Sequence, residues 1–160
     1  MTTTTQPGTT TYEEVGDRGL VITRVFAAPA SAVFAAWTDP AHLPNWLGPA
    51  KHAMTVCEID LRVGGGYRYE WQLAGGGALR MHGTYTEVDA PHRLVSTEIM
   101  DDFPGQSVNE MDLVEEEGVT ICRCTVTYDT PESRAGALGS GMKGGIDEGY
   151  DRLDAIFAAG

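Results

Sequence analysis

Few residues in this chain suit acid–base chemistry, and Glu98 is the main candidate. In an extended strand alternate side chains share one face, so Glu98 shares its face with Leu94 and Met100 and can turn inward with them. A carboxyl that is removed from water has a raised pKa, and it can anchor a polar ligand group or act as a general acid or base. Tyr69 and Tyr85 are further candidates for proton transfer.

The histidines and cysteines do not form a metal-binding pattern. Cys122 and Cys124 share one face of a predicted strand, but two thiols need further ligands that the sequence does not supply. The histidines, none of which are paired at ligand spacing, are His42, His52, His82 and His92. We therefore expect no metal and no cofactor. The three cysteines are an odd number, which argues against a disulfide framework and predicts reduced thiols.

Two glycine triplets, at 64–66 and 75–77, resemble phosphate-binding loops only superficially. A phosphate loop follows a strand and opens a helix, whereas each triplet here precedes a strand-type segment. Both are therefore interpreted as turns or bulges. The serines lie in no nucleophile-elbow context, so a catalytic triad is not expected.

Composition excludes several classes of function. The 160 residues are 42% hydrophobic, which suits one domain with one core. The formal net charge of −12 repels nucleic-acid phosphates and anionic lipid, so we expect no nucleic-acid partner. The sequence contains neither a long apolar run nor a signal-peptide pattern, so we expect no membrane insertion and a cytoplasmic location.

The elements follow from periodicity and turn residues. Residues 1–18 are rich in Thr and Gly and predict a disordered leader, with a single domain over 19–160. A strand is expected over 20–27, then a helix beginning at Pro29 and a short helix over 41–47. Further strands are expected at 52–62, 66–73, 78–88, 92–100, 106–116 and 119–128.

The segment from Pro131 to the end predicts one helix that closes the chain. Its apolar residues recur every three or four positions and form one stripe, namely Met142, Ile146, Tyr150, Leu153 and Phe157. Several glycines interrupt this helix, and each costs a helix interior roughly 1 kcal/mol relative to Ala. The helix therefore needs the sheet to hold it.

The chain resembles the SRPBCC superfamily, with its START-like or birch-pollen-allergen-like helix-grip fold. Within it the chain resembles the group named for the activator homologue of the heat-shock-protein-90 ATPase. The matching segments, in order, are ITRVFAAPASAVFAAWTDPAHLPNWLGP, DLRVGGGYRYE, GTYTEVDAPHRLVSTEIMDD, TYDTPESR and SGMKGGIDEGYDRLDAIF. The resemblance implies an α+β fold, in which a curved antiparallel sheet wraps a long C-terminal helix, with two short helices after the first strand. The chain departs from the family at Ile146 and Asn45, where the family commonly has Trp.

The resemblance also implies a cavity between sheet and helix for a small apolar or amphipathic ligand. Strand alternation and the helical stripe indicate which side chains face it. The candidate ligand-binding residues are Phe34, Trp37, Trp46, Tyr67, Tyr69, Trp71, Met81, Tyr85, Met111, Cys124, Met142, Ile146 and Tyr150. His82 alternates to the opposite face from Tyr85, so we expect it to be exposed.

Three functions remain open from the sequence. The first is a binding protein for a small apolar or amphipathic molecule, whose affinity comes from apolar burial. The second is a cyclase or aromatase in which the same pocket folds a flexible chain and Glu98, Tyr69 or Tyr85 moves protons. The third is a co-chaperone that activates a chaperone ATPase, which the family name implies. Exposed sheet edges also permit a homodimer.

Overall fold

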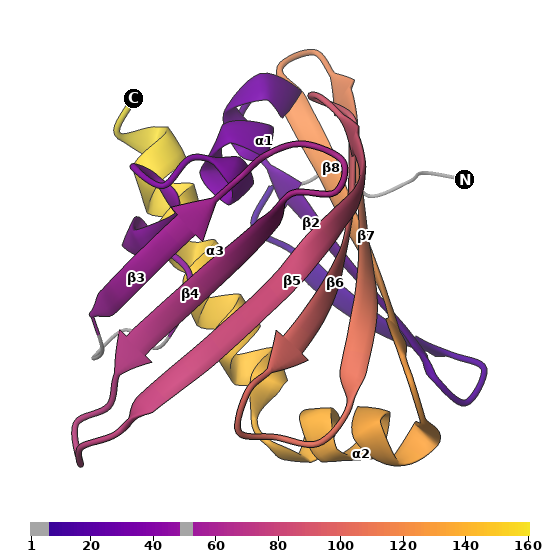
Figure 1. The fold of residues 1–160 in the computed structure, drawn as a ribbon. Helices are drawn as coiled ribbons and strands as arrows, with labels where there is room; N and C mark the ends of the chain where they lie inside the picture. The colour runs from indigo at the N-terminus through magenta and orange to yellow at the C-terminus, as the bar shows by residue number, and fades with distance from the viewer. Residues whose placement is uncertain (1–6, 49–52) are drawn as a thin grey trace.

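The chain forms one antiparallel sheet that curls around its last helix (Figure 1). The structure, a computed structural model, describes residues 7–48 and 53–160. In chain order the elements are β1 (Thr10–Val15), β2 (Gly19–Phe26), α1 (Ala30–Thr38), the 3-10 helix η1 (Leu43–Asn45), β3 (Met54–Ile59), β4 (Gly66–Gln72), β5 (Ala78–Asp89), β6 (Arg93–Met100), β7 (Gln106–Glu116), β8 (Val119–Tyr128), α2 (Pro131–Gly139) and α3 (Met142–Ala158).

The strand order is β1-β2-β8-β7-β6-β5-β4-β3, and every neighbouring pair is antiparallel. Strands β3 to β8 follow one another as a meander, and β8 then pairs with β2. The segment with α1 and η1 must therefore lead from β2 to the far edge of the sheet, where β3 lies (Figure 1). The predicted fold class, a helix-grip α+β fold, is confirmed.

The predicted strands agree with the observed ones to within three residues. The predicted strand over 52–62 begins outside the described residues, as does His52. The short helix predicted over 41–47 is only the three-residue 3-10 turn η1. The prediction of a disordered leader is wrong for residues 10–15, because these residues form β1 and pair with β2 from Thr10↔Arg24 to Val15↔Gly19.

The prediction of one closing helix from Pro131 onward is also wrong, because the segment forms two helices, α2 and α3. Thr130 caps α2 by accepting a hydrogen bond from the Ser133 amide at 3.0 Å. The chain then turns at Gly141, whose φ of 84° lies in the left-handed region that favours glycine. The break allows α3 to leave α2 at a new angle and lie across the concave face of the sheet (Figure 1).

Contacts from two strands hold α3 in place. Buried Arg24 on β2 pairs with Asp151 at 2.9 Å and also with Asp154, both on α3. Tyr12 on β1 donates a hydrogen bond to Asp147 at 2.7 Å. Leu153 of α3 is 1% exposed and belongs to the main core. The helix is therefore held by polar contacts along one side and by apolar burial beneath.

Candidate functional site

The concave face carries a row of aromatic side chains on β4. Tyr67, Tyr69 and Trp71 alternate along the strand, and all three are buried. The Tyr67 and Tyr69 rings are stacked with centroids 4.7 Å apart, and Tyr69 meets Trp71 edge-on at 6.2 Å. They face inward, as strand alternation predicts.

Gly83 on β5 makes room for the first ring of this row. Gly83 is the cross-strand partner of Tyr67, and the Tyr67 hydroxyl donates to the Thr97 carbonyl at 2.8 Å. A Cβ at position 83 would lie 1.9 Å from that carbonyl oxygen and 2.7 Å from the Tyr67 hydroxyl. Only glycine therefore allows Tyr67 to reach across β5 to β6.

Tyr85, the next inward residue along β5, has an unusual hydroxyl. The side chain is 2% exposed, its ring lies 5.6 Å from that of Tyr67, and burial raises its pKa to about 12. The Tyr69 hydroxyl lies nearby, yet among the described residues no group completes a hydrogen bond to the Tyr85 oxygen. A buried hydroxyl without a partner is costly, so the Tyr85 oxygen is an exception among buried polar groups.

Glu98 also faces inward, from β6. Its cross-strand partner is Ser107, which is buried, and Asn109 donates a hydrogen bond to its carboxylate at 3.4 Å. Burial raises the pKa of Glu98, and the hydrogen bond from Asn109 lowers it by a smaller amount. Glu98 and Tyr128 are both cross-strand neighbours of Ser107, and burial followed by the charge of Glu98 raises the pKa of Tyr128 to about 12. Glu98, Tyr67 and Tyr128 thus form one polar cluster.

One end of the concavity is filled by α1, η1 and the middle of α3. The Trp37 and Trp46 rings are 4.5 Å apart, and Tyr150 lies within 6.1 Å of both. The Trp46 indole donates to the Ala36 carbonyl at 2.8 Å, and Phe34 is 5% exposed. Trp37, Trp46 and Tyr150, all predicted as ligand contacts, pack against one another, and Phe34, also predicted as one, belongs to the same core.

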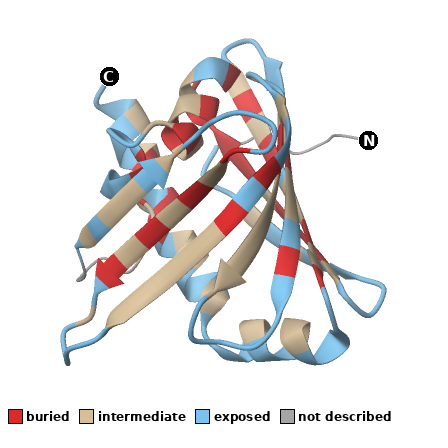
Figure 2. Ribbon diagram, viewed as in Figure 1, coloured by how far each residue is buried: buried red, intermediate tan, exposed pale blue. Residues whose placement is uncertain are grey.

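The other end of the concavity is less completely filled. Its inward side chains on β5 and β6, Met81 and Met100, are cross-strand partners, and both are only partly buried. On α3, Met142 and Ile146 are also partly buried, and the Tyr128 hydroxyl donates to the Met142 sulfur at 3.5 Å. In Figure 2 the first part of β5 is intermediate, whereas Gly83 and Tyr85 further along the strand are buried.

Two cysteines and a methionine lie between these ends. Cys122 and Cys124 have sulfur atoms 3.9 Å apart, and Met111 on β7 pairs with Cys124. The hydrogen bond with Cys124 and burial raise the pKa of the Cys122 thiol. Across the described residues no group of three potential metal ligands occurs, so these thiols have no third protein ligand there.

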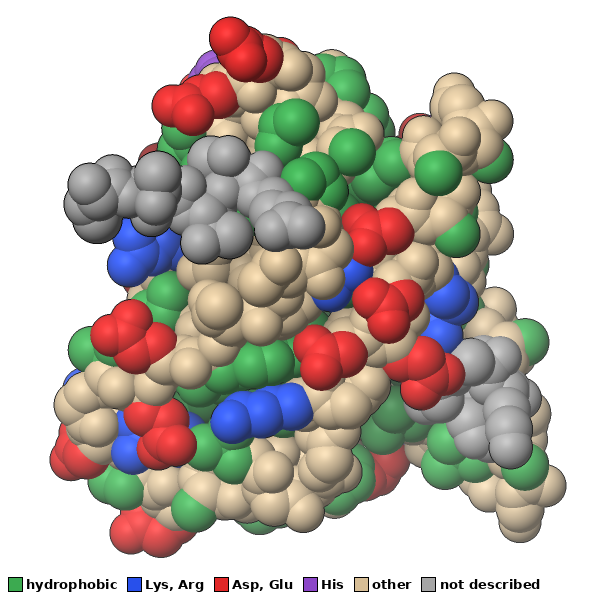
Figure 3. Space-filling model, turned by 180° about the vertical axis from the view of Figure 1, so that it is seen from behind, with side chains coloured by type: hydrophobic (Ala, Val, Ile, Leu, Met, Phe, Trp, Pro, Cys, Tyr) green, Lys and Arg blue, Asp and Glu red, His purple; other side chains and the backbone are tan. Residues whose placement is uncertain are grey.

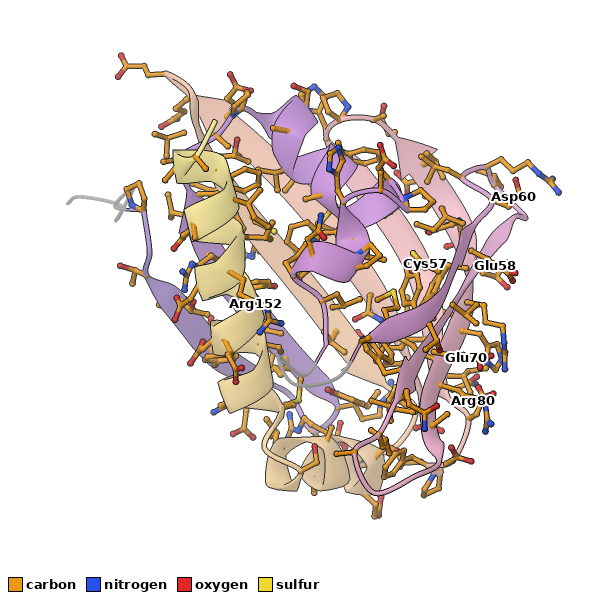
Figure 4. The ribbon with its side chains drawn as sticks, turned by 90° about the vertical axis from the view of Figure 1, so that its left-hand side faces the viewer. Cys57, Glu58, Asp60, Glu70, Arg80 and Arg152 are labelled. Atoms are coloured by element: carbon orange, nitrogen blue, oxygen red, sulfur yellow. The ribbon has the colours of Figure 1, made fainter. Side chains whose placement is uncertain are left out.

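Charged residues of β4 and β5 lie on the outer face of the sheet. Arg80 lies 3.7 Å from Glu70, and both point away from the concave side, whereas Cys57 on β3 lies among the inward residues (Figure 4). His82 is 40% exposed and lies 2.7 Å from Asp101, as expected for the face opposite Tyr85. The hydrogen bond from His82 lowers the pKa of Asp101.

Arg152 joins α3 to η1 near the filled end of the concavity. It extends from the helix toward η1 and donates to the carbonyls of Trp46 and Gly48, each at 2.5 Å (Figure 4). The outward side of α3 is acidic, and Figure 3 shows Asp and Glu side chains gathered on the face of the molecule that carries this helix.

Two surface hollows lie away from this cluster. One, of about 470 Å³, is lined by residues of β7 and of the β5–β6 turn, including Arg93 and Asp112. The other, of about 230 Å³, lies where Gly8 approaches Phe157 near the end of α3. Neither contains Glu98 or the tyrosines of β4, so neither is part of the candidate site.

Sequence reasoning left out Asn109 and Tyr128, both of which lie beside Glu98. The same alternation that indicated Met111 applies to them, because Ser107, Asn109, Met111 and Leu113 share one face of β7. Asn109 was missed because polar residues on a strand normally face water. Alternation along β8 likewise places Tyr128 on the face of Cys122 and Cys124, but it is not among the predicted ligand contacts.

The chain is similar to one known family and to several solved structures. The family model described as Activator of Hsp90 ATPase homolog 1-like protein matches residues 27–158. A crystal structure of a protein from Rhodobacter sphaeroides is 32% identical, with a TM-score of 0.87, and the match covers 94% of this chain and 99% of that one. A protein from Mycobacterium smegmatis is 29% identical, with a TM-score of 0.81 and the same coverage.

A solution structure of a protein from Arthrobacter aurescens is 23% identical with a TM-score of 0.82, and the match covers 94% of this chain and 92% of that one. At this identity the likeness shows the fold alone. No protein with a curated description is significantly similar to the chain in sequence. Within residues 7–48 and 53–160, no helix is both long and apolar enough to cross a membrane.

Proposed function

We propose that this chain, which belongs to the Activator of Hsp90 ATPase homolog 1-like family, binds a small apolar or amphipathic molecule between its sheet and α3. The observation that carries the proposal is the uneven filling of the concave face. At one end Leu94, Met111 and Leu113 are at most 6% exposed, whereas at the other end the inward-facing Met81 and Met100 remain partly exposed. Apolar side chains that point inward without full burial favour a guest molecule at that end.

The proposed pocket has an apolar wall and a polar end. Its wall consists of Met81 and Met100 from the sheet and Met142 and Ile146 from α3, all of them partly buried. Methionine is flexible and polarizable, so such a wall adapts to guests of different shape. The polar end is the cluster around Glu98, which would fix the orientation of an amphipathic guest.

A homologous series of linear alcohols tests this proposal. Each buried CH₂ contributes about 0.8 kcal/mol, so affinity should rise roughly fourfold per carbon from 1-hexanol to 1-octanol. A ligand that binds only the folded state raises the melting temperature in proportion to the logarithm of its concentration over Kd. Thermal shift and titration calorimetry measure the two quantities, and a series without any shift would count against a pocket.

A matched pair of tryptophan substitutions locates the binding site. Met81→Trp fills the proposed pocket and should abolish alcohol binding, whereas Thr84→Trp places the same ring on the exposed outer face of β5 and should leave binding intact. Equal binding by both variants would mean that the alcohols bind elsewhere.

A second candidate function is a proton-transfer reaction in the same pocket, and the position of Glu98 favours it. Burial raises the pKa of this carboxyl, which suits a general acid, and the unpartnered Tyr85 hydroxyl can donate to a carbonyl oxygen. Once a bound compound is known, conversion of that compound by the wild type and loss of turnover in Glu98→Gln would identify this reaction.

A further inference from the structure

Glu98 is an inward-facing carboxyl without a cationic partner among the residues that the structure describes. Buried Arg24 on β2 is paired with Asp151 and Asp154, but among the described residues no Lys, Arg or His lies within ion-pair distance of Glu98. Its single hydrogen-bond donor is the neutral amide of Asn109 at 3.4 Å. Glu98 is partly buried, and a partly buried carboxylate without a counter-charge is costly, so the site is electrostatically incomplete.

Aromatic rings surround this carboxyl. The hydroxyls of Tyr67 and Tyr128 lie close enough for the charge of Glu98 to act on them. Tyr69 stacks on Tyr67 at 4.7 Å, and Tyr85 lies 5.6 Å from Tyr67 with its hydroxyl unpartnered. The face of an aromatic ring is electron-rich and attracts cations. Four tyrosines and one carboxylate therefore make this end of the pocket attractive to positive charge.

Three arginines, on β2, α2 and α3, are engaged by other groups. Arg134 of α2 donates to the carbonyls of Gly16 and Gly19, both at 3.0 Å. Arg24 pairs with two aspartates of α3, and Arg152 donates to carbonyls at η1. None of these three forms an ion pair with Glu98 in the described part of the chain, so a guest molecule can supply the missing positive charge.

We infer that the molecule bound in this pocket is a cationic amphiphile, with an ammonium group held by Glu98 and the tyrosine rings and an apolar tail along the methionine wall. This inference rests on the proposed function. A fatty acid or another anionic amphiphile would bring a second negative charge against Glu98, and the net charge of −12 adds to that repulsion at long range. The chemistry thus selects amines over carboxylates of equal length.

Three probes of equal chain length test the charge preference: octylamine, 1-octanol and octanoate, titrated at pH 7.5 by calorimetry. We expect octylamine to bind at least about tenfold more tightly than 1-octanol, because its ammonium group gains a charge-assisted hydrogen bond and cation–π contacts that the hydroxyl does not. Octanoate should bind more weakly than the alcohol. Equal affinity for amine and alcohol would overturn the inference while leaving the pocket intact, whereas failure of all three to bind would refute the proposed function itself.

Glu98→Gln and Glu58→Gln form a matched pair of variants. Both remove one negative charge, but Glu58 lies exposed on the outer side of β3 (Figure 4). Glu98→Gln should lower the preference for octylamine over 1-octanol several-fold, because the carboxylate charge is lost while the tyrosine rings remain, and Glu58→Gln should leave the preference unchanged. An amine preference that is undiminished in Glu98→Gln would overturn the role of Glu98 in binding the ammonium.

The pH dependence of wild-type binding tests the inference without any substitution. Affinity for octyltrimethylammonium, whose charge is independent of pH, should rise as pH increases through the pKa of Glu98, while affinity for 1-octanol stays constant. Around Glu98, Tyr67, Tyr85 and Tyr128 all have raised pKa values and stay neutral at such pH, and Ser96, Ser107 and Asn109 do not titrate. Arg134 of α2, which acts on Tyr128, is a permanent cation throughout the range because of its guanidinium chemistry. A flat profile for the ammonium probe would contradict the role of Glu98.

Discussion

Replacing Gly83 by alanine should be far more destabilising than an ordinary surface substitution. The added Cβ would lie 1.9 Å from the Thr97 carbonyl oxygen, and that oxygen belongs to the backbone of β6. Real Cβ atoms essentially never approach within 3.0 Å of such an atom, so β5 and β6 must separate locally. The contact cannot be relieved by a side-chain rotation.

The magnitude follows from the two interactions that the methyl group disturbs. Forcing additional volume into a packed site costs about 1–3 kcal/mol, and the lost hydrogen bond from Tyr67 to Thr97 adds about 1 kcal/mol. The expected loss in the free energy of unfolding is therefore about 2–4 kcal/mol. For a chain of this length each kcal/mol lowers the melting temperature by about 2–4 °C, which predicts a fall of roughly 5–15 °C.

Urea unfolding followed by tryptophan fluorescence measures this loss, because Trp71 is buried in the same aromatic row. Gly75→Ala is the matched control: this glycine lies in an exposed turn, and a Cβ there meets nothing within 4 Å. The control should be neutral or slightly stabilising. If the two variants differ by less than about 0.5 kcal/mol, a figure typical of surface substitutions, the steric argument is wrong.

Two further predictions concern charged groups of the interior. Arg24→Met should lower the free energy of unfolding by about 1–3 kcal/mol, as measured by urea titration. The loss arises because α3 loses its hydrogen bonds to β2, while the partly exposed partner carboxylates remain hydrated. An unchanged urea midpoint of unfolding would show that apolar packing alone holds the helix. The pKa of Glu98 is higher in the folded state than in the unfolded state. Its contribution to the free energy of unfolding is therefore fully present below the unfolded-state pKa of about 4.3, and this contribution is lost as pH rises through the folded-state pKa. Glu98→Gln should therefore become more stable relative to wild type as pH increases from 4 to 8, as measured by unfolding at several pH values, and parallel pH profiles would contradict this.

The main sheet could be predicted from the sequence because hairpin strands are local features. Turn residues and alternation indicate where each strand begins and ends, and the observed strands β3 to β8 follow these signals to within three residues. The strand β1 carried no such signal. Its polar, Thr-rich residues become a strand by pairing with β2 and by the bond from Tyr12 to Asp147, which lies 135 positions further along the chain.

At the C-terminal end the sequence predicted one helix where the structure has two. The apolar stripe from Met142 to Phe157 correctly predicted α3, but Gly141 was interpreted as one of several poor helix residues rather than as a break. A glycine within a helical pattern can either weaken the helix or end it, and local sequence does not distinguish these outcomes. Packing of α3 against the sheet determines that the chain turns at this position.

The sequence by itself determined which side chains share a face, because alternation in a strand and the stripe on a helix are properties of the backbone alone. It therefore indicated that Tyr67, Tyr69, Met81 and Glu98 could face one interior. Only the tertiary structure decided which part of that interior is filled, since this depends on where α1, η1 and α3 come to rest against the sheet. Their packing closes one end around Trp46 and leaves Glu98 at the other end, because elements distant in sequence fill space only once the chain has folded.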